Sequence, residues 1–218
     1  MKYFVSALSL SLLLVSGCGS TIEDLKSESQ QSTVPTTEAD GVVTATVTAS
    51  KDAKVVASRS GNVADSSIEI SAGTLVITTD SVDLAMGEAT DRTADLAPSL
   101  GFTAQTVVDG TTSLFVGSAA GASIATLQPM TLNLPLPIKA DSLKLAGGGQ
   151  LALIYLIYTS SGYKAGIKPL ESADLKGVFV NTKVDGLGFY RVIYLPVKVP
   201  AKEVEVTLTP SLKTVSQK

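Results

Sequence analysis

Short runs in which β-branched or apolar residues alternate with polar ones recur through most of the chain after residue 41. In residues 43–49, valine and alanine alternate with threonine, and this period of two is typical of a half-buried strand. Gly, Pro, Asp and Ser interrupt the runs about every ten residues, which is the spacing of strands and turns in sandwiches and barrels. The pattern predicts an all-β fold, most simply an antiparallel β-sandwich.

The other predicted strands share this alternation or are continuously apolar. They cover residues 54–58, 67–71, 74–78, 103–108, 113–116, 130–136, 150–159, 177–183, 188–195 and 203–209. Residues 150–159 carry apolar side chains on both faces, so we expect a central strand that is covered on both sides. Helical periodicity is scarce: the best candidate is 81–95, where a loop is an equal alternative, and 94–101 is a connection or a single helical turn.

The first residues have the composition of an export signal. Lys2 precedes an apolar run at 4–15. A run of about 12 residues is too short for a bilayer core, which needs about 20, but it suits a secretory signal that ends in small residues.

This run ends in Leu14-Val15-Ser16-Gly17-Cys18, which closely resembles the lipobox of bacterial lipoproteins. The resemblance implies cleavage between Gly17 and Cys18, with a thioether-linked diacylglycerol and an N-acyl chain, such as palmitate, on Cys18. Two or more acyl chains anchor a protein stably to a membrane. Because Gly19 follows instead of Asp, the family's sorting pattern implies the bacterial outer membrane, with the body on its periplasmic face or at the cell surface. The alternative is an ordinary cleaved signal with an unrelated cysteine.

The composition divides the remaining chain. Residues 18–40 are rich in Ser and Thr and contain no aromatic residue, which predicts a disordered tether; a short helix at 22–29 is the alternative. The aromatic residues after the signal all lie between Phe102 and Tyr194, so we expect the main core in the second half. The predicted organisation is a signal at 1–17, the tether, edge strands at 41–59, the main sandwich at 60–209 and a tail at 210–218.

Several stretches, in order, resemble ZU5-type β-sandwich modules of bacterial surface proteins. Residues 67–75 (SIEISAGTL) are similar to the family's strand–PAGAL–strand signature, with Ser71 where proline is usual. Residues 129–135 (PMTLNLP) are similar to its PVTLxLP strand. Residues 151–158 are similar to the family's strand that ends in YY, and the following Lys168-Pro169-Leu170 is similar to its WxPL segment, although the tryptophan is absent. Residues 186–190 (GLGFY) stand where the family has its final aromatic strand. The resemblance implies an interaction module without catalytic residues.

The composition also excludes several kinds of function. The formal net charge is -3, so the chain has no basic footprint for nucleic acid. It contains 0 His and 1 Cys, which excludes histidine-based catalysis, most zinc sites and an intrachain disulfide. We therefore expect no cofactor beyond the covalent lipid.

Three groups of residues are candidates for chemistry. The acidic segment holds weak calcium candidates and carboxylate pairs for glycan hydrolysis, although a polar loop is the simpler interpretation; its residues are Asp80, Asp83, Glu88, Asp91 and Asp95. Ser142 and Lys144 are two residues apart and would point the same way on a strand, as a nucleophilic serine and its lysine partner must. A solvated surface is the simpler interpretation of this pair. Tyr163 follows a Ser-Ser-Gly turn, where we expect an exposed aromatic ring that forms an interaction surface.

Three functional hypotheses follow. The first is a membrane-anchored, non-catalytic envelope lipoprotein that binds a protein or another envelope component. The second is a structural lipoprotein that self-associates through its sheet edges. The third, and weakest, is a carboxylate-based glycan hydrolase.

Overall fold

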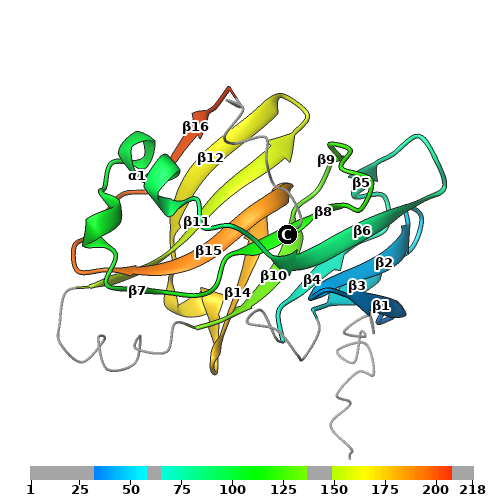
Figure 1. The fold of residues 1–218 in the computed structure, drawn as a ribbon, viewed down its shortest axis with the longest axis horizontal. Helices are drawn as coiled ribbons and strands as arrows, with labels where there is room; N and C mark the ends of the chain where they lie inside the picture. Colours follow the sequence, from blue (N-terminus) through cyan, green and yellow to red (C-terminus); the bar gives the residue numbers. More distant parts are fainter. Residues whose placement is uncertain (1–31, 58–64, 137–148, 208–218) are drawn as a thin grey trace, which may run out of the picture. The chain divides into compact units, whose positions relative to one another are not determined.

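The computed structural model of the chain describes residues 32–57, 65–136 and 149–207 (Figure 1). They form an all-β, antiparallel sandwich of two main sheets, as the alternating pattern predicts. The larger sheet has nine strands in the order β1-β2-β6-β8-β15-β11-β12-β16, with β7 paired to β15. The smaller has five, in the order β13-β14-β10-β4-β3, and β5 and β9 form a separate pair.

The strands of the larger sheet are listed here in chain order. They are β1 (Thr36–Ala39), β2 (Val42–Thr48), β6 (Ser81–Glu88), β7 (Asp109–Gly110), β8 (Leu114–Ser118), β11 (Gln150–Thr159), β12 (Gly162–Pro169), β15 (Leu187–Leu195) and β16 (Lys202–Glu205). The remaining elements are β3 (Ala53–Val56), β4 (Ser67–Ile70), β5 (Leu75–Val76), α1 (Thr93–Leu100), a 3₁₀ helix (Ala104–Thr106), β9 (Ala125–Thr126), β10 (Met130–Pro135), a second 3₁₀ helix (Ser172–Asp174), β13 (Leu175–Lys176) and β14 (Phe179–Val184).

The main core lies between the two sheets. Along β10, Met130, Leu132 and Leu134 are buried while the residues between them are half-buried, so one face of the strand points into the sandwich. The same alternation turns Leu153 of β11 and Val192 of β15 toward the smaller sheet, where they join one buried apolar cluster. Burial of this continuous apolar area is the main stabilising contribution to the fold.

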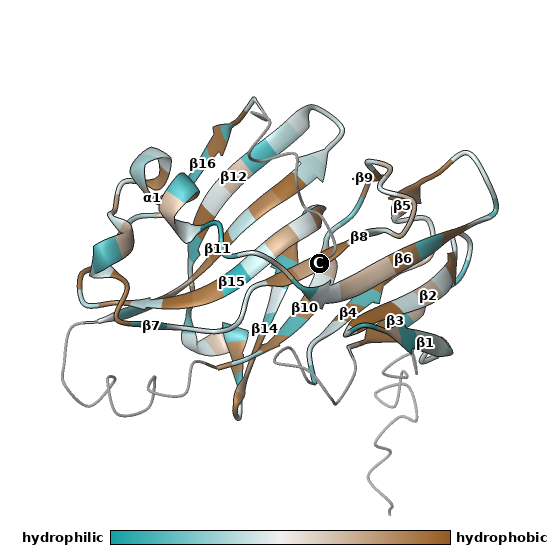
Figure 2. Ribbon diagram, in the orientation of Figure 1, coloured by the Kyte–Doolittle hydropathy of each residue, from teal (hydrophilic) through white to brown (hydrophobic). Residues whose placement is uncertain are grey.

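A second core covers the opposite face of the larger sheet. Helix α1 lies against this face (Figure 1), and its Leu96 and Leu100 pack with Ile154 of β11 and Ile167 of β12. Strands β11 and β15 are therefore apolar along most of their length (Figure 2). Strand β11 lies between β15 and β12 and is covered on both faces, which confirms the predicted central strand.

The helix predicted at 81–95 is wrong in its first half. Residues 81–88 form β6, which is hydrogen-bonded to β2 on one side and β8 on the other. Leu84 and Met86 face the main core, while Ala85 is buried on the opposite face. Leucine, alanine and methionine favour helices, but pairing with two neighbouring strands overrides this local preference. The helix instead covers Thr93–Leu100, longer than the single turn expected, and ends at Gly101, whose φ is 90°.

Two further boundaries differ from the predictions. Residues 36–39, assigned to the tether, form β1, which pairs with β2 through a two-residue turn. The φ angles of Asp40 and Gly41 in that turn are 53° and 75°, the positive values that a tight hairpin requires. Strand β2 is consequently not an edge strand, because it lies between β1 and β6. Residues 104–106 of the strand predicted at 103–108 form a 3₁₀ helix, in which the amide of Thr106 bonds to the carbonyl of Thr103.

Candidate functional site

A small pocket of about 50 Å³ opens between the sheets beside β11. It combines aliphatic, aromatic and charged side chains from both sheets and from the turn between β14 and β15. The lining residues are Leu153, Tyr155, Ile157, Lys168, Lys183, Val184, Asp185 and Tyr190. An apolar wall with a few polar groups is the usual lining of a small-ligand pocket, but such pockets typically measure roughly 300–1,000 Å³, and this one is much smaller.

Tyr155 forms one wall of the pocket and lies flat across the neighbouring strand. The residue opposite it on β12 is Gly166, and a Cβ atom there would lie 2.1 Å from Cζ of the tyrosine ring. The ring therefore occupies the space of a missing side chain. Its hydroxyl reaches the next strand, where it donates a hydrogen bond to Oε2 of Glu203 at 3.0 Å. Lys164 bonds the other oxygen of the same carboxylate at 2.8 Å, so Glu203 is held from two sides.

The second tyrosine forms the buried end of the pocket. Tyr190 is opposite Tyr155 on β15, is fully buried, and donates its hydroxyl to the carbonyl of Gly186. Burial and then the charge of Asp185 raise the pKa of Tyr190 well above its ordinary value. Burial followed by the charge and hydrogen bond of Glu203 likewise raises the pKa of Tyr155. Both phenols stay protonated near neutral pH, so they donate hydrogen bonds there and do not act as general bases.

An ion pair ties the two sheets together beside this pocket. The ammonium of Lys168 on β12 lies 2.5 Å from the hydroxyl of Thr182 on β14 and 3.4 Å from Oδ1 of Asp174. Thr182 in turn donates to Asp174. Burial raises the pKa of Asp174, but the hydrogen bonds from Thr182 and the Glu171 amide, together with the Lys168 charge, outweigh it, so the pKa lies below its ordinary value. The pair is a fixed structural contact.

Asp185 lies in the turn that carries the chain from β14 in the smaller sheet to β15 in the larger one. Its side chain is exposed, and its backbone carbonyl accepts a hydrogen bond from Thr126 at 2.6 Å. Within the described part of the chain, its carboxylate has no hydrogen-bond or ion-pair partner. Asp185 is thus the pocket's unneutralised anionic group.

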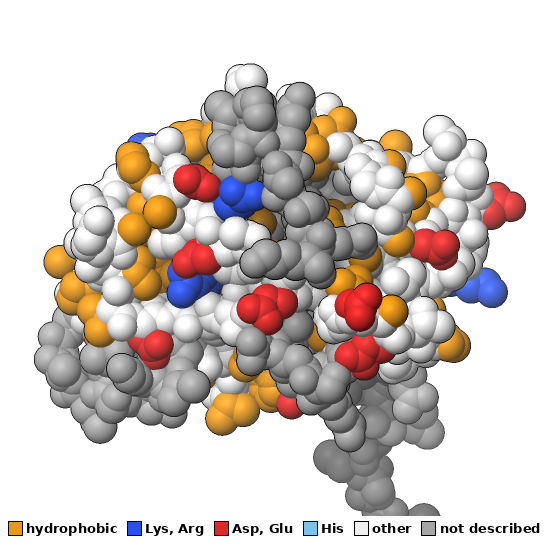
Figure 3. Space-filling model, viewed as in Figure 1, with side chains coloured by type: hydrophobic (Ala, Val, Ile, Leu, Met, Phe, Trp, Pro, Cys, Tyr) orange, Lys and Arg blue, Asp and Glu red, His pale blue; other side chains and the backbone are white. Residues whose placement is uncertain are grey.

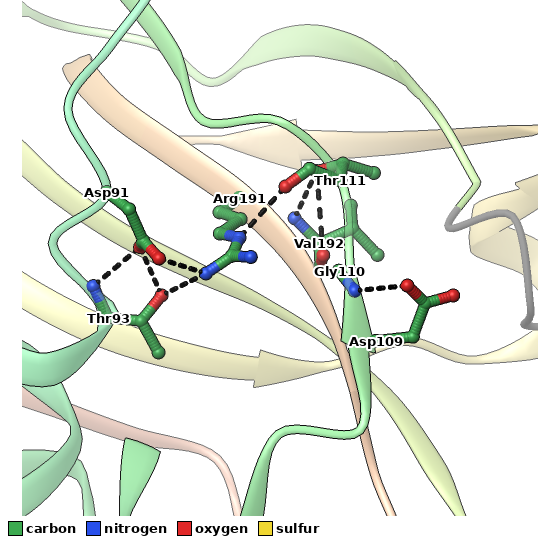
Figure 4. A network of polar contacts seen from close by, with 7 residues as sticks. All are labelled: Asp91, Thr93, Asp109, Gly110, Thr111, Arg191 and Val192. Atoms are coloured by element: carbon green, nitrogen blue, oxygen red, sulfur yellow. Dashed lines mark hydrogen bonds and ion pairs between the residues drawn. The ribbon is translucent and has the colours of Figure 1, made fainter. Parts of the chain in front are cut away.

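A second polar network fastens the start of α1 to the larger sheet (Figure 4). Nη1 of Arg191 on β15 lies 2.5 Å from Oδ2 of Asp91 and 2.7 Å from Oγ1 of Thr93, and its Nε donates to the carbonyl of Thr111 at 2.9 Å. Asp91 also accepts the backbone amide of Thr93 at 2.8 Å, at the first residue of the helix. A Cβ atom at Gly110 would lie 3.0 Å from Nη2 of Arg191, so the guanidinium packs closely over that glycine. These contacts engage Nε and Nη1 of the guanidinium and fix the start of α1 on the larger sheet.

The acidic candidates from the sequence are not brought together. Asp83 accepts the hydroxyl of Thr46 at 2.6 Å, Asp91 pairs with Arg191, and Asp95 lies 3.5 Å from Arg92. Asp80 lies in the turn before β6, where its carbonyl accepts the amide of Ala49. No cluster of three or more metal-ligating side chains occurs in residues 32–57, 65–136 and 149–207.

Tyr163 is less free than its position in a hairpin suggests. Strands β11 and β12 form a hairpin around the predicted Ser-Ser-Gly turn, with Thr159 opposite Gly162. The Tyr163 ring, however, is half-buried and packs edge-on against Tyr158, with the ring centroids 5.0 Å apart. Its hydroxyl lies 2.8 Å from Oγ of Ser123. The ring thus joins the hairpin to the segment that follows β8.

The remaining candidates, Gly17, Cys18, Ser142 and Lys144, lie outside the described residues. Within the described residues, no helix has the length and apolar character to cross a bilayer. On the face seen in Figure 3, acidic and basic side chains are scattered among apolar and uncharged ones and do not gather in one charged patch. The pocket was not foreseen in the sequence, because its residues come from strands whose pairing no local motif reveals. No protein-family model, curated protein or solved structure matches the chain.

Proposed function

We propose that this chain is a lipid-anchored lipoprotein of the bacterial outer membrane whose β-sandwich binds a ligand or a protein without catalysing a reaction. The observation that carries the anchor is the sequence Leu14-Val15-Ser16-Gly17-Cys18. The described body begins at residue 32, and the intervening chain can span at most about 50 Å when fully extended. An acylated Cys18 would therefore keep the sandwich close to the membrane surface.

A binding role is supported by how the charged groups of the sandwich are used. Glu203, Asp174 and Asp91 are held by Lys164, Lys168 and Arg191, respectively, in contacts of 2.8, 3.4 and 2.5 Å. Carboxylates that are held in this way serve poorly as a general acid and base pair. The pocket beside β11 offers recognition groups in their place. The stretches that resemble ZU5 modules fall on β4–β5, β10 and β11–β12, which suits a sandwich of that interaction class.

The anchor is tested by labelling the full chain with radioactive palmitate in cells and separating membranes from soluble protein. The wild type should carry label and sediment with membranes, whereas Cys18→Ala should lose the label and be released. Ser20→Ala, two residues away, is the matched control and should keep both properties. Unchanged membrane retention of Cys18→Ala would contradict the anchor. Crosslinking in the native envelope followed by mass spectrometry would then identify the partner.

The hydrolase alternative has its own test. We expect no glycan turnover by the wild type, and alanine substitutions at Asp80, Asp83, Glu88, Asp91 and Asp95 should therefore leave it at background. Measurable hydrolysis by the wild type that disappears in a folded variant would replace the binding proposal with a catalytic one.

A further inference from the structure

Two exposed aliphatic side chains lie side by side on the small strand pair of β5 and β9. Val76 and Leu127 are 49% and 70% exposed. Val76 is opposite Ala125, and the amide of Leu127 continues the pairing by donating to the carbonyl of Thr74 at 2.8 Å. Because side chains alternate along paired strands, Val76, Ala125 and Leu127 point to the same face. We call this surface the apolar tip.

The segments that carry the apolar tip contain no charged residue. Residues 70–79 (ISAGTLVITT) and 119–129 (AAGASIATLQP) have apolar, hydroxyl and amide side chains, and the nearest charge along the chain is Asp80. The other exposed large aliphatic residues of the described chain lie one or two positions from a charge; they are Val108, Val178 and Val197, beside Asp109, Lys176 and Lys198. A surface without charges can leave water at a lower cost than one that carries them.

The apolar tip lies at the end of the sandwich where the described chain begins. The hydroxyl of Ser32 lies 3.5 Å from the carbonyl of Asp52, whose carboxylate accepts the amide of Ala72 at 2.7 Å. Ala72 is two residues before Thr74, whose carbonyl binds Leu127. Figure 1 shows β5 and β9 at the end where β6 begins and β8 ends. The chain therefore enters the sandwich at the end that carries the apolar tip.

These observations agree on one partner. In the proposed lipoprotein, the acylated Cys18 lies in the membrane, at most about 50 Å of extended chain from Ser32. We infer that the apolar tip contacts the lipid surface, with Val76 and Leu127 at the boundary between headgroups and acyl chains. Two aliphatic side chains would bind a bilayer weakly by themselves, but the anchor makes the contact intramolecular and raises the effective concentration. The inference rests on the proposed anchor and names the face of the sandwich that the anchor turns toward the membrane.

A protein interface fits the same surface less well. The cores of protein–protein interfaces are enriched in aromatic residues and arginine, and a typical interface buries about 800 Å² on each partner. Residues 70–79 and 119–129 contain neither an aromatic residue nor an arginine. A fluid lipid surface, by contrast, requires no complementary shape and no hydrogen-bond partner from the tip.

The chain contains no tryptophan, so a single introduced tryptophan reports its own surroundings. The acylated full chain is purified from membranes and reconstituted on phosphatidylethanolamine–phosphatidylglycerol vesicles, with or without brominated acyl chains, which quench tryptophan on contact. Leu127→Trp should be quenched about twofold, and its emission should shift to the blue. Val178→Trp is the matched control and should show neither change, because Val178 is 66% exposed at the opposite end of the sandwich.

A second reporter leaves Leu127 unchanged. Thr78 is exposed and follows Val76 by two residues, so Thr78→Trp should also be quenched. Adding Leu127→Asp should remove this quenching, because the carboxylate must stay in water, whereas adding Val178→Asp should have no effect.

The outcomes separate the tip from the anchor. Equal quenching of Leu127→Trp and Val178→Trp, equal effects of the two aspartates, or no quenching in a chain that floats with the vesicles would overturn the inference while the anchor stands. A chain that does not float with the vesicles would contradict the anchor, and the inference with it.

Discussion

Tyr155 and Gly166 face each other across β11 and β12, and a Cβ atom at residue 166 would lie 2.1 Å from Cζ of the tyrosine ring and 2.3 Å from its hydroxyl oxygen. A glycine inside a strand ordinarily weakens it, because it has no side chain to pack and loses more conformational freedom on folding. Here the aromatic ring of the opposite residue covers the exposed backbone, which is a recognised way to stabilise a strand glycine.

Gly166→Ala should destabilise the fold by about 2 kcal/mol, because the added methyl group forces the ring away from Glu203. The free energy of urea unfolding measures this loss. The same substitution in a Tyr155→Ala background should cost far less, since the obstructing ring is absent, and the double-mutant cycle isolates the contact. Equal losses in both backgrounds would show that residue 166 acts through something other than the tyrosine.

Asp174 should make stability depend on pH in the acid range. Its pKa in the folded state lies below the ordinary value of 3.8, so the ionised form favours folding. The contribution is fully present above the unfolded-state value and is lost as the pH falls through the lower folded-state pKa. Asp174→Asn should therefore lower stability by about 1–3 kcal/mol at neutral pH and flatten the acid limb of the stability curve. Glu205→Gln, on an exposed part of β16, should leave that limb unchanged.

Arg191 should be irreplaceable by lysine, although the charge is the same. A single ammonium cannot contact Asp91, Thr93 and the carbonyl of Thr111 together, as the guanidinium does. Arg191→Lys should cost about 1–2 kcal/mol and speed amide hydrogen exchange in α1, whose first residue belongs to this network. Lys51→Arg at an exposed site is the reference substitution. Unchanged exchange in α1 would mean that its packing on the sheet is sufficient to hold it.

The sequence predicted the strands whose patterns are unambiguous. Residues 130–136 alternate regularly, residues 150–159 are apolar throughout, and both form strands in the structure. Strand β6 was missed because its Leu, Ala and Met residues suit a helix equally well, and only its two neighbours decide the matter. Strand β12 was missed because Gly166 interrupts its pattern, and its stability depends on Tyr155 from another strand.

The pocket beside β11 could not be predicted from the sequence. Lys168, Asp185 and Tyr190 meet because β12, β14 and β15 are placed around β11 by strand pairing and by the turn between the sheets. The order of strands in a sheet is a property of the whole chain, and neither periodicity nor composition contains it. The Asp-Gly pair at 40–41, by contrast, is a hairpin signal that the sequence does contain, and it marks the start of β2.

Whether the edge strands of the sheets can pair with a second copy of the chain distinguishes a binding module from a self-associating protein. Strand β1 has 4 residues and follows Pro35, while the backbone of Ser32 and Val34 bonds to Lys54 and covers the edge of β3. The other edge of the larger sheet is β16. If two copies of β16 paired antiparallel, with the same face of each sheet on the same side, Glu203 of one copy would lie close to Glu205 of the second. Short, covered or like-charged edges oppose strand addition.

We therefore expect the Cys18→Ala chain, which should lack the lipid, to sediment as a monomer at high protein concentration and at low salt. Raising the salt screens the repulsion between glutamates and provides the internal comparison, because any weak association through β16 should then increase. A stable dimer at low salt would contradict the expectation and favour the structural alternative. Its interface could then be located by placing proline at Thr36 on β1, whose amide points away from β2; this removes a backbone donor from that edge and should dissociate a dimer formed there.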